Sequence, residues 1–510
     1  MTHEPEKSDG SIVAGKPAND PGQPGSERVE PRGPAKGNTV QADTYRTQVR
    51  GSVPQGLERV RQAARKRKGE RFTALLHHVD EAALHAAYLG LKRDAAAGID
   101  GVTWQEYGEG LEPRLRDLHD RIHRGAYRAR PSRRVFIPKP DGRQRPLGIA
   151  ALEDKIVQSA VVRVLNAIYE EDFLGFSYGF RPGRSQHDAL DALATGITRK
   201  KVNWILDADI RSFFDTVSHD WLIRFVEQRV GDRRIVRLIG KWLKAGVLED
   251  GVLAESPEGT PQGAVISPLL ANIYLHHVID LWAHQWRQSH ARGDVIMIRY
   301  ADDMIAGFQH KADAERFLAA LRQRLEQHSL ALHPAKTRLI EFGRYAAERR
   351  RERGLGKPEP FDFLGFTHIA GRDRRGAFQL KRKTRRDRKR TKLQAIAQDL
   401  RRRWHHPVQE QGRWLGQVVR GYFNYHAVPG NLSALRGFLG DVRRLWWQAL
   451  RRRSQKDRTS WAKLDRLAAA WLPRPTILHP WPDARFDRHH PRWEPGAVVP
   501  HAGFCAGGAG

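Results

Sequence analysis

Hydrophobic and polar positions follow two different patterns along this chain. Short apolar runs occur at residues 204–206, 295–298 and 304–308, each next to charged residues. Runs of this length predict buried β-strands. Elsewhere apolar residues recur every three or four positions, which predicts helices with one buried face. The predicted helices are residues 59–68, 80–92, 114–122 and 149–165, the first of them rich in Arg, Lys and Ala.

A pair of adjacent carboxylates separates two of these apolar runs. Tyr-Ala-Asp-Asp at 300–303 lies between residues 295–299 and 304–308, so the two runs predict a β-hairpin with acids at its tip. An apolar strand tolerates neighbouring aspartates only where a turn or a cation compensates them. An ordinary Asp-rich turn fits the pattern, and so does a carboxylate site for Mg²⁺.

A second strand ends in acids about 90 residues upstream. Residues 204–209 read Trp-Ile-Leu-Asp-Ala-Asp, and side chains two apart share a face, so Asp207 and Asp209 point the same way. If Asp209 lies beside the hairpin tip, three carboxylates surround a metal pair of the kind used in phosphoryl transfer. Alternatively, the acids cap a helix starting near Asp215. That alternative suits Asp215 better than Asp209, which an isoleucine and two phenylalanines follow.

The charge balance narrows the choice of partner. The formal net charge is +30 and the pI is about 10.6, which favours a polyanionic partner over a merely solvated basic surface. No apolar run approaches the roughly 18 residues of a spanning helix, so we expect no membrane partner. The single cysteine, Cys505, excludes an internal disulfide and a zinc site built on several thiolates. With no apolar signal-peptide core at the N-terminus, these features predict a cytoplasmic protein.

Several segments occur together in a fixed order. Gly-Thr-Pro-Gln-Gly begins residues 259–274, and Phe-Asp-Phe-Leu-Gly-Phe occupies residues 361–366. Together with Asp-Ile-x-x-Phe-Phe-Asp at 209–215, Ser-Tyr-Gly-Phe-Arg-Pro-Gly-Arg-Ser at 177–185 and Tyr-Ala-Asp-Asp at 300–303, they resemble the sequence blocks of reverse transcriptases.

Two further segments narrow the resemblance to one branch of that family. Gly-Ile-Asp-Gly-Val-Thr at 98–103 and Arg-Gly-Tyr-Phe-Asn-Tyr-His at 420–426 resemble signatures of group II intron reverse transcriptase/maturases. The resemblance covers roughly residues 90–470. Many members of that family end in a DNA endonuclease domain that carries Cys and His residues. The single cysteine predicts that this domain is missing here.

The resemblance implies an α+β fold with the right-hand architecture of polymerases. Mostly helical fingers and a palm with an antiparallel sheet would precede an all-helical thumb, or maturase, domain. The expected parts are a disordered tail at 1–55 that is rich in Gly and Pro, a helical N-terminal extension at 56–130, fingers and palm at 131–370, a thumb that binds RNA at 371–475, and a short C-terminal tail at 476–510.

The resemblance also implies the chemistry. Asp209, Asp302 and Asp303 are the expected catalytic residues and, with the backbone carbonyl of Ile210, the expected ligands of two Mg²⁺ ions. The implied reaction is the extension of a DNA primer on an RNA template. In this reaction the primer 3′-hydroxyl attacks the α-phosphate of a deoxynucleoside triphosphate (dNTP).

Residues 133–148 predict a hairpin that turns at Asp141-Gly142. The resemblance places Lys139 and Arg145 of this hairpin on the triphosphate, because Arg and Lys are the usual phosphate ligands. The alternative is an edge hairpin whose charges prevent aggregation.

Three more residues are assigned to the nucleotide by the resemblance. Phe214 is the expected steric gate against a ribose 2′-hydroxyl, with Phe213 facing the core; the reverse arrangement is the alternative. Gln262 is expected near the nucleotide and template, and Lys336 near the pyrophosphate. The alternatives are a simple Pro-Gly turn and a solvated surface lysine.

A basic run followed by aromatic residues begins the expected thumb. The RNA-binding residues predicted here are Lys381, Arg382, Lys383, Arg385, Arg386, Arg388, Lys389 and Arg390. Basic residues interleaved with aromatics suit structured RNA, although a solvated face is the alternative.

The expected partners are a group II intron RNA, an RNA template with its DNA primer, and target DNA. Binding the intron RNA would assist its splicing and mobility. The sequence predicts no oligomeric state. Rival functions are a bacterial reverse transcriptase of the retron or diversity-generating type and a non-catalytic RNA-binding maturase.

Overall fold

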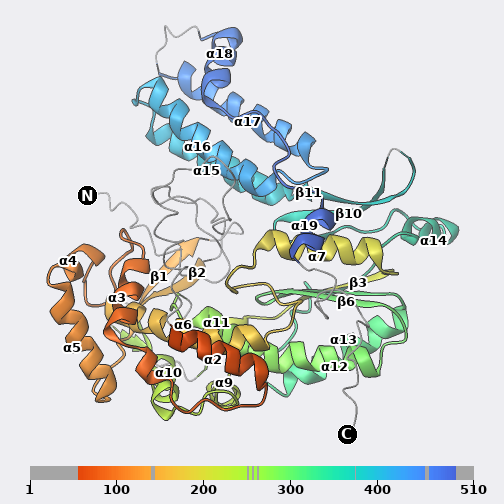
Figure 1. The fold of residues 1–510 in the computed structure, drawn as a ribbon. Helices are drawn as coiled ribbons and strands as arrows, with labels where there is room; N and C mark the ends of the chain where they lie inside the picture. The colour runs from red at the N-terminus through yellow and green to blue at the C-terminus, as the bar shows by residue number, and fades with distance from the viewer. Residues whose placement is uncertain are drawn as a thin grey trace.

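The computed structural model describes residues 55–138, 144–249, 252–254, 258–260, 263–373, 375–453 and 459–489. Figure 1 shows a wide body of helices and sheets, and a column of helices that stands on it. The mixed α+β class is confirmed. The predicted N-terminal tail lies outside the described residues, except for Gln55.

Helices lead the described part of the chain, as the sequence predicts. They are α2 (Gln55–Lys66), the 3₁₀ turn η1 (Leu76–His78), α3 (Glu81–Gly90), α4 (Trp104–Gly108) and α5 (Leu111–His123). Asp80 begins α3 as an N-cap that accepts a 2.7 Å hydrogen bond from the Ala83 N–H. A capping box formed by Thr103 and Glu106 begins α4.

The first sheet joins two hairpins that are far apart in sequence. Its strands are β1 (Ser132–Pro138), β2 (Gln144–Ile149), β4 (Val247–Glu249) and β5 (Val252–Ala254), in the order β2-β1-β4-β5. Strands β1 and β2 pair in antiparallel register up to Pro138↔Gln144, which confirms the predicted hairpin. The predicted turn, residues 139–143, lies outside the described residues. The fingers therefore contain more β-structure than the mostly helical fingers expected.

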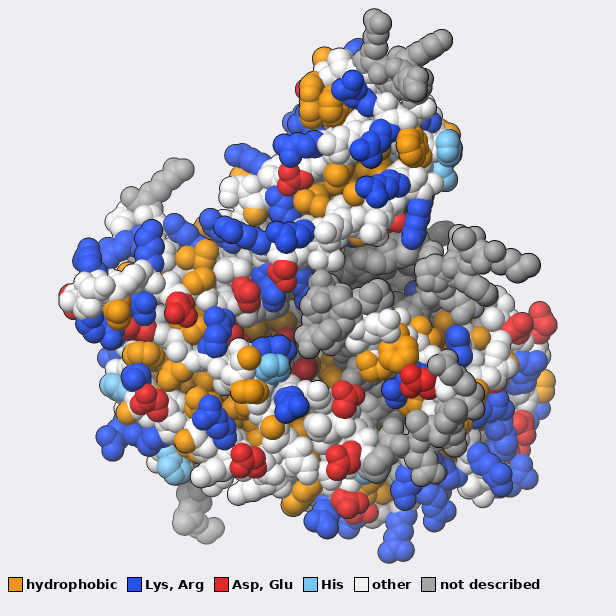
Figure 2. Space-filling model, turned by 180° about the vertical axis from the view of Figure 1, so that it is seen from behind, with side chains coloured by type: hydrophobic (Ala, Val, Ile, Leu, Met, Phe, Trp, Pro, Cys, Tyr) orange, Lys and Arg blue, Asp and Glu red, His pale blue; other side chains and the backbone are white. Residues whose placement is uncertain are grey.

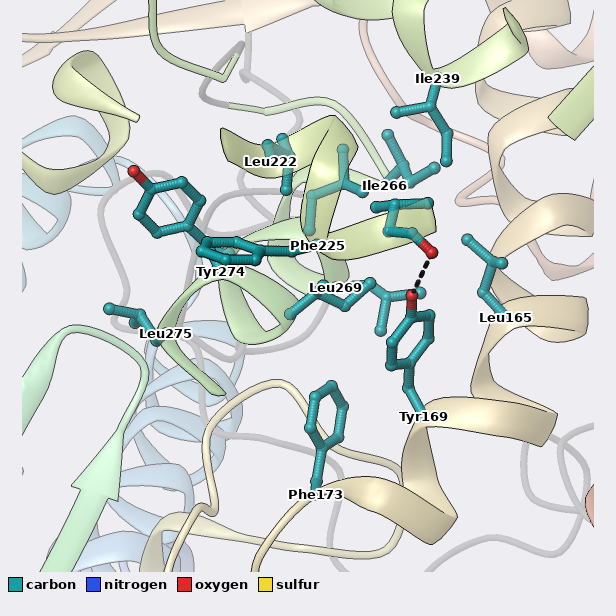
Figure 3. Packing of buried hydrophobic residues seen from close by; sticks show 14 of the residues in the cluster. Leu165, Tyr169, Phe173, Leu222, Phe225, Ile239, Ile266, Leu269, Tyr274 and Leu275 are labelled. Atoms are coloured by element: carbon teal, nitrogen blue, oxygen red, sulfur yellow. Dashed lines mark hydrogen bonds between the residues drawn. The ribbon is translucent and has the colours of Figure 1, made fainter. Parts of the chain in front are cut away.

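The long helix α6 (Leu152–Asp172) crosses the largest hydrophobic core. The positions that face this core, as the sequence predicts, are Ile156, Val157, Ala160, Val161 and Val164. Around α6 lie α9 (His219–Glu227), α10 (Arg233–Lys244) and α11 (Ser267–Leu275). Figure 3 shows this packing and the 3.1 Å hydrogen bond that the Tyr169 hydroxyl donates to the Val226 carbonyl. The same core contains Leu206 and Ala208, so it also supports the palm sheet.

The palm sheet is entirely antiparallel. Its strands are β6 (Val295–Tyr300), β7 (Asp303–Phe308), β3 (Trp204–Asp209) and β8 (Arg338–Glu341), in that spatial order. In Figure 1, α7 (Gln186–Arg199) lies on one side of the sheet, and α12 (Leu281–Ser289) and α13 (Lys311–Glu326) lie on the other. Every residue of β6 is buried, because both faces are covered. The predicted strands and acid-tipped hairpin are confirmed.

A third sheet joins the palm to the thumb. It contains β9 (Phe361–Phe363), β10 (Phe366–Arg372) and β11 (Phe378–Thr384) in the order β11-β10-β9, and α14 (Ala346–Glu352) precedes it. The thumb helices are α15 (Arg386–Arg402), α16 (Val408–His426), α17 (Leu432–Arg451) and α18 (Trp461–Trp471). Their own core contains Phe438 and Trp446, both fully buried. The expected all-helical part from residue 371 therefore begins with strand, because β11 pairs with β10 along its full length.

The expected C-terminal tail is docked on the palm over its described part. Helix α19 (Pro482–His489) packs on α7, where two guanidinium nitrogens of Arg199 each lie 2.8 Å from an Asp487 carboxylate oxygen. The Nε of Arg485 lies 3.1 Å from Oδ2 of Asp191 in α7. Among the helices of the described ranges, none combines the length and the apolar character needed to cross a lipid bilayer.

Candidate active site

The strand register brings the three predicted catalytic aspartates to one end of the palm sheet. Asp209, the last residue of β3, pairs with Asp303, the first residue of β7, so their side chains share a face. Asp302 lies in the adjoining turn between β6 and β7. Ala301 has a φ of 56°, the left-handed conformation that a two-residue hairpin turn requires. Their proximity agrees with the sequence, and their catalytic role stays a prediction.

Two cations neutralise the acids of β3. The Nζ of Lys336 lies 2.7 Å from Oδ2 of Asp209, and Nη2 of Arg338 lies 3.3 Å from Oδ2 of Asp207. The Lys336 side chain is 55% exposed, so it can leave Asp209 without disturbing the core. The predicted contact of Lys336 with the pyrophosphate stays a prediction.

Desolvation and the neighbouring acids raise the pKa values of Asp303 and Asp207. The pKa of Asp303 is raised to about 7, first by desolvation and then by the negative charges of Asp302, Asp209 and Asp207. The Asp303 residue is exposed to solvent on one side, yet the surrounding protein removes much of the hydration of its carboxylate. The pKa of Asp207 is raised to about 6, again mainly by desolvation, while Arg338 opposes the shift. Shifts of this kind are concentrated at functional sites.

These groups fit a divalent cation, although the structure shows no complete metal site. Among the described residues, no three His, Cys, Asp or Glu side chains are placed so that they could hold one ion. Asp209 and Asp303 nevertheless offer the hard oxygen donors that Mg²⁺ prefers. A cation beside them would offset both the desolvation and the repulsion that raise the Asp303 pKa, and it would compete with Lys336 for Asp209.

The carbonyl of Ile210 is directed away from the segment that contains Leu332. Ile210 forms an isolated antiparallel bridge with Leu332. Both hydrogen bonds of this bridge, each 2.8 Å, are made by the residues that flank Ile210. In this pattern the residue's own N–H and C=O point to the opposite side of its strand. That is the edge of β3 on which β7 pairs, and the role of the Ile210 carbonyl as a metal ligand stays a prediction.

Both phenylalanines of the predicted gate are buried at the start of α8 (Phe213–Thr216). Phe213 meets Tyr274 edge-on, with 6.3 Å between ring centroids. The Phe214 carbonyl accepts a 2.8 Å hydrogen bond from the Thr260 N–H. Gly259 has a φ of 87°, and a Cβ there would lie 2.8 Å from the same carbonyl. Both rings belong to the same hydrophobic core, so the choice of Phe214 over Phe213 as the gate stays a prediction.

Three predicted nucleotide contacts fall where the structure gives no side-chain position. Lys139 and Gln262 lie outside the described residues, and so does the side chain of Arg145. Gly263, next to Gln262, has a φ of 113°, and a Cβ there would lie 2.4 Å from the Gly148 carbonyl of β2. This close backbone contact places the start of the segment after Gln262 against the fingers hairpin.

The basic run at the start of the thumb is only partly a surface. Lys383, Arg386 and Arg390 are exposed, and Lys381, Arg385, Arg388 and Lys389 are half-buried. Arg382 is 2% exposed, with Nη1 2.8 Å from Oδ1 of Asp191. We therefore correct its assignment to RNA, because a guanidinium paired inside the protein does not reach a phosphate. Figure 2 shows Lys and Arg side chains over the thumb and over the body below it.

Sequence reasoning missed two contacts of the site. The Tyr425 hydroxyl, within the segment 420–426, donates a 2.8 Å hydrogen bond to the Leu364 carbonyl. The Tyr425 ring also stacks on Phe366 at 5.7 Å, so two of the recognised segments pack on each other. The second missed residue is Arg299, which is fully buried directly before the hairpin tip. Its only sequence signal is a charge within an apolar run.

The family comparison covers the parts of the chain that form this site. Residues 137–368 match the family described as reverse transcriptase (RNA-dependent DNA polymerase). This range contains strand β2 of the fingers hairpin, the whole palm sheet and the three aspartates. Polymerases of this kind use divalent metal ions.

Similar proteins come from introns as well as from a bacterial genome. The chain is 38% identical over 237 residues to protein YkfC of Escherichia coli, covering 41% of this chain and 62% of that protein. It is 35% identical over 224 residues to the group II intron-encoded protein LtrA of Lactococcus lactis, covering 44% and 37%. It is 45% identical over 148 residues to an uncharacterized 91 kDa protein in the cob intron of Schizosaccharomyces pombe, covering 29% and 18%.

Each match spans less than two thirds of the relative's length. The matches agree with the site geometry and with the order of the recognised segments. The comparisons therefore show that residues 137–368 are similar to reverse transcriptases and that the chain is similar to group II intron-encoded proteins over part of their length.

Proposed function

We propose that this chain is an RNA-directed DNA polymerase that extends a DNA primer on an RNA template and binds its group II intron RNA to assist splicing and mobility. The observation that carries the proposal is the register that pairs Asp209 with Asp303. This register gathers three acids at one end of the palm sheet, where desolvation and then the charges of the neighbouring acids raise the pKa of Asp303 to about 7.

We assign metal binding and phosphate binding to different residues of the site. Asp209, Asp302 and Asp303 would hold two Mg²⁺ ions, with the Ile210 carbonyl as a further ligand. Bound Mg²⁺ supplies the Lewis acidity that activates the primer hydroxyl and stabilises the departing pyrophosphate. Asp303 must be ionised to act as a ligand, so cation binding is favoured as the pH rises through about 7. Lys336, once released from Asp209, is available to pair with a phosphate.

The RNA partner is proposed from charge and from likeness to relatives. The formal net charge of +30 favours a polyanion, and Lys383, Arg386 and Arg390 are exposed where the thumb begins. The relative from Lactococcus lactis is named as a group II intron-encoded protein. Intron RNA, the RNA template with its DNA primer, and target DNA are therefore the partners that we propose.

A non-catalytic RNA-binding maturase is the second candidate. It is favoured by the ammonium of Lys336 on Asp209 and by the lack, within the described ranges, of three converging ligand side chains. This candidate predicts RNA binding without DNA synthesis. A reverse transcriptase of the retron or diversity-generating type is disfavoured by the intron-encoded relatives.

Primer extension and RNA filter binding, measured on one preparation, test the proposal. Wild-type protein should extend a DNA primer on RNA. The Asp302→Ala/Asp303→Ala variant should lose extension and keep RNA binding, because RNA binding rests on a distributed basic surface. The matched control is Asp220→Ala, an exposed acid in the first turn of α9, which should retain both activities.

Two outcomes would redirect the proposal. Extension at the wild-type rate by the double variant would show that the metal ligands lie elsewhere. RNA binding by wild-type protein with no extension in Mg²⁺ or Mn²⁺ would favour the non-catalytic maturase.

A further inference from the structure

One buried arginine connects the aspartate hairpin to two other segments of the chain, the one around Ser177 and the continuous helix α11–η2. Arg299 is the next-to-last residue of β6 and is 0% exposed. All five N–H donors of its guanidinium have acceptors. Its hydrogen bonds are Nε to Asp280 Oδ1 at 2.7 Å, Nη2 to Asp280 Oδ2 at 2.6 Å, Nη2 to Ser177 Oγ at 2.7 Å, Nη1 to Asn272 Oδ1 at 3.0 Å, and Nη1 to the Ala301 carbonyl at 2.9 Å.

The carboxylate partner comes from an unusual helix. Asp280 is fully buried and ends the π-helical turn η2 (His276–Asp280), which joins α11 to α12. Single π-turns are rare and are frequent at functional sites. A buried ion pair is weak evidence for stability, because well-packed apolar residues often serve a core equally well. Stability alone therefore does not explain the pair of Arg299 with Asp280, and we ask which group the pair orients.

The group that Arg299 orients lies in the turn between β6 and β7. The Ala301 carbonyl, which accepts from Arg299, belongs to the residue with a φ of 56°. A left-handed alanine is strained and persists only when its surroundings hold it. Gly179 holds the turn from the other side, since a Cβ there would lie 2.3 Å from the Ala301 nitrogen.

Asn272 closes the network around this turn. Its Nδ2 donates a 2.7 Å hydrogen bond to the Gly179 carbonyl, and its Oδ1 accepts from Arg299. The segment that precedes Gly179 also pairs with the backbone of Arg299, because Ser177 forms a parallel bridge with it. The turn that carries Asp302 is thus clamped between Arg299 and Gly179.

We propose that Arg299 is a positioning residue for the metal-binding carboxylates. Its pair with Asp280 fixes the Ala301 carbonyl, and the fixed turn sets the direction in which Asp302 and Asp303 leave the hairpin. Arg299 acts on the carboxylates through Ala301. The expected effect on DNA synthesis rests on the proposed function. Lysine would keep the charge but not the planar set of five donors, so it should not replace Arg299.

The chain offers a matched control in another Arg–Asp pair, whose arginine is buried and whose aspartate is partly buried. The Nε of Arg229 lies 2.8 Å from Oδ2 of Asp172. Its Nη1 donates to the backbone carbonyls of Arg67, at 3.0 Å, and Glu70, at 2.6 Å. Arg229→Lys therefore weakens the same kind of pair as Arg299→Lys. None of these partners of Arg229 belongs to the aspartate hairpin.

Three measurements on both variants test the inference. They are the melting temperature, Mn²⁺ binding by calorimetry or by electron paramagnetic resonance, and hydrogen–deuterium exchange of the peptide that covers residues 296–306. Arg299→Lys should weaken Mn²⁺ binding by about 10- to 100-fold, the range typical of residues that orient metal ligands. It should also speed amide exchange at the turn and lower kcat more than it raises KM for dNTP. Arg229→Lys should lower the melting temperature without changing Mn²⁺ binding or exchange at the turn.

Wild-type Mn²⁺ affinity and wild-type exchange in folded Arg299→Lys would overturn the inference. If wild-type protein does not extend primers, the proposed function fails, while Mn²⁺ binding and exchange still decide the positioning role. If Arg299→Lys does not fold, Ser177→Ala removes one of the five bonds in a milder way. A several-fold loss of Mn²⁺ affinity in Ser177→Ala then supports the inference, and an unchanged affinity overturns it.

Discussion

The ammonium of Lys336 lies 2.7 Å from Oδ2 of Asp209, so a protein cation already neutralises one of the three clustered aspartates. The lysine side chain is 55% exposed, and an exposed pair of this kind contributes at most about 1 kcal/mol to stability. We infer that the pair serves the site more than the fold. It balances an acid cluster that would otherwise repel itself, and it can be released when a stronger cation binds.

Replacing Lys336 tests two separate roles of this lysine: its competition with a metal ion for Asp209 and its contact with the pyrophosphate. In Lys336→Met, Mn²⁺ should bind several-fold more tightly at pH 8.5 without nucleotide, because the ammonium no longer competes for Asp209. If Lys336 also contacts the pyrophosphate, KM for dNTP should rise by about 10-fold or more, the value of one charge-assisted hydrogen bond. Calorimetry and steady-state primer extension measure the two effects. Unchanged Mn²⁺ affinity would contradict the competition.

The raised pKa values predict how the stability of the metal-free protein depends on pH. An acid whose folded pKa is raised contributes stability that is complete below its ordinary pKa, 3.8, and is lost as the pH rises through the folded value. For Asp207 and Asp303 those folded values are about 6 and about 7. These two groups should therefore lower the melting temperature in EDTA between pH 5 and pH 8.

Added Mg²⁺ should restore the melting temperature more at pH 8 than at pH 5.5, because the ligands must be ionised. Asp303→Asn should flatten the pH dependence, since the amide does not titrate. Thermal melts of both proteins across this range, with and without Mg²⁺, provide the measurement. Identical pH profiles for wild-type protein and Asp303→Asn would show that Asp303 does not titrate near neutral pH.

The local patterns that the sequence predicted correctly are those set by neighbouring residues. The two apolar runs at residues 295–298 and 304–308 form the hairpin β6–β7, and the apolar spacing of residues 149–165 forms the buried face of α6. The pairing of Asp209 with Asp303 joins residues 94 positions apart. That pairing was expected only because several segments resemble one family.

What the sequence did not predict depends on three-dimensional neighbours. Arg382 reads as one member of a basic run, yet its place in β11 turns it toward Asp191 of α7, which lies far away in sequence. Alternation within a strand sends Lys383 to the other face, where it is exposed. The network of Arg299 was missed for the same reason, since its distant partners come from two segments, the one around Ser177 and the continuous helix α11–η2, which meet Arg299 only in the fold.

The corrected basic surface gives a charge-matched test of RNA binding. Changing Lys383, Arg386 and Arg390 to Gln should weaken RNA binding and flatten its salt dependence by up to about 0.7 to 0.9 log units per lost phosphate contact. The control removes three exposed arginines in and just after helix α5 of the N-terminal extension, Arg114, Arg116 and Arg124, and should leave the slope nearly unchanged. Equal slopes for both triple variants would mean that the thumb run is only a solvated face.

Arg382→Gln should change different properties from the variant in which Lys383, Arg386 and Arg390 are replaced. It should lower stability while leaving the salt dependence of RNA binding unchanged. Removing one partner of a buried pair costs about 3–5 kcal/mol when the other charge is left alone. The cost should be smaller here, because Arg485 still lies 3.1 Å from Asp191. Chemical denaturation beside filter binding distinguishes the two roles.

Substitution by valine should affect stability at Phe213 and sugar discrimination at Phe214. Phe213 packs edge-on against Tyr274, so Phe213→Val should mainly destabilise, by about 1–4 kcal/mol, as core truncations do. If Phe214 lies beneath the sugar ring, Phe214→Val should raise incorporation of ribonucleotides relative to deoxynucleotides, because the smaller side chain no longer collides with a 2′-hydroxyl. Single-nucleotide extension with matched dNTP and rNTP, beside thermal melts, measures both. The gate assignment fails if Phe214→Val stays folded and active but keeps the wild-type discrimination ratio, and a changed ratio in Phe213→Val would show that the two rings have exchanged roles.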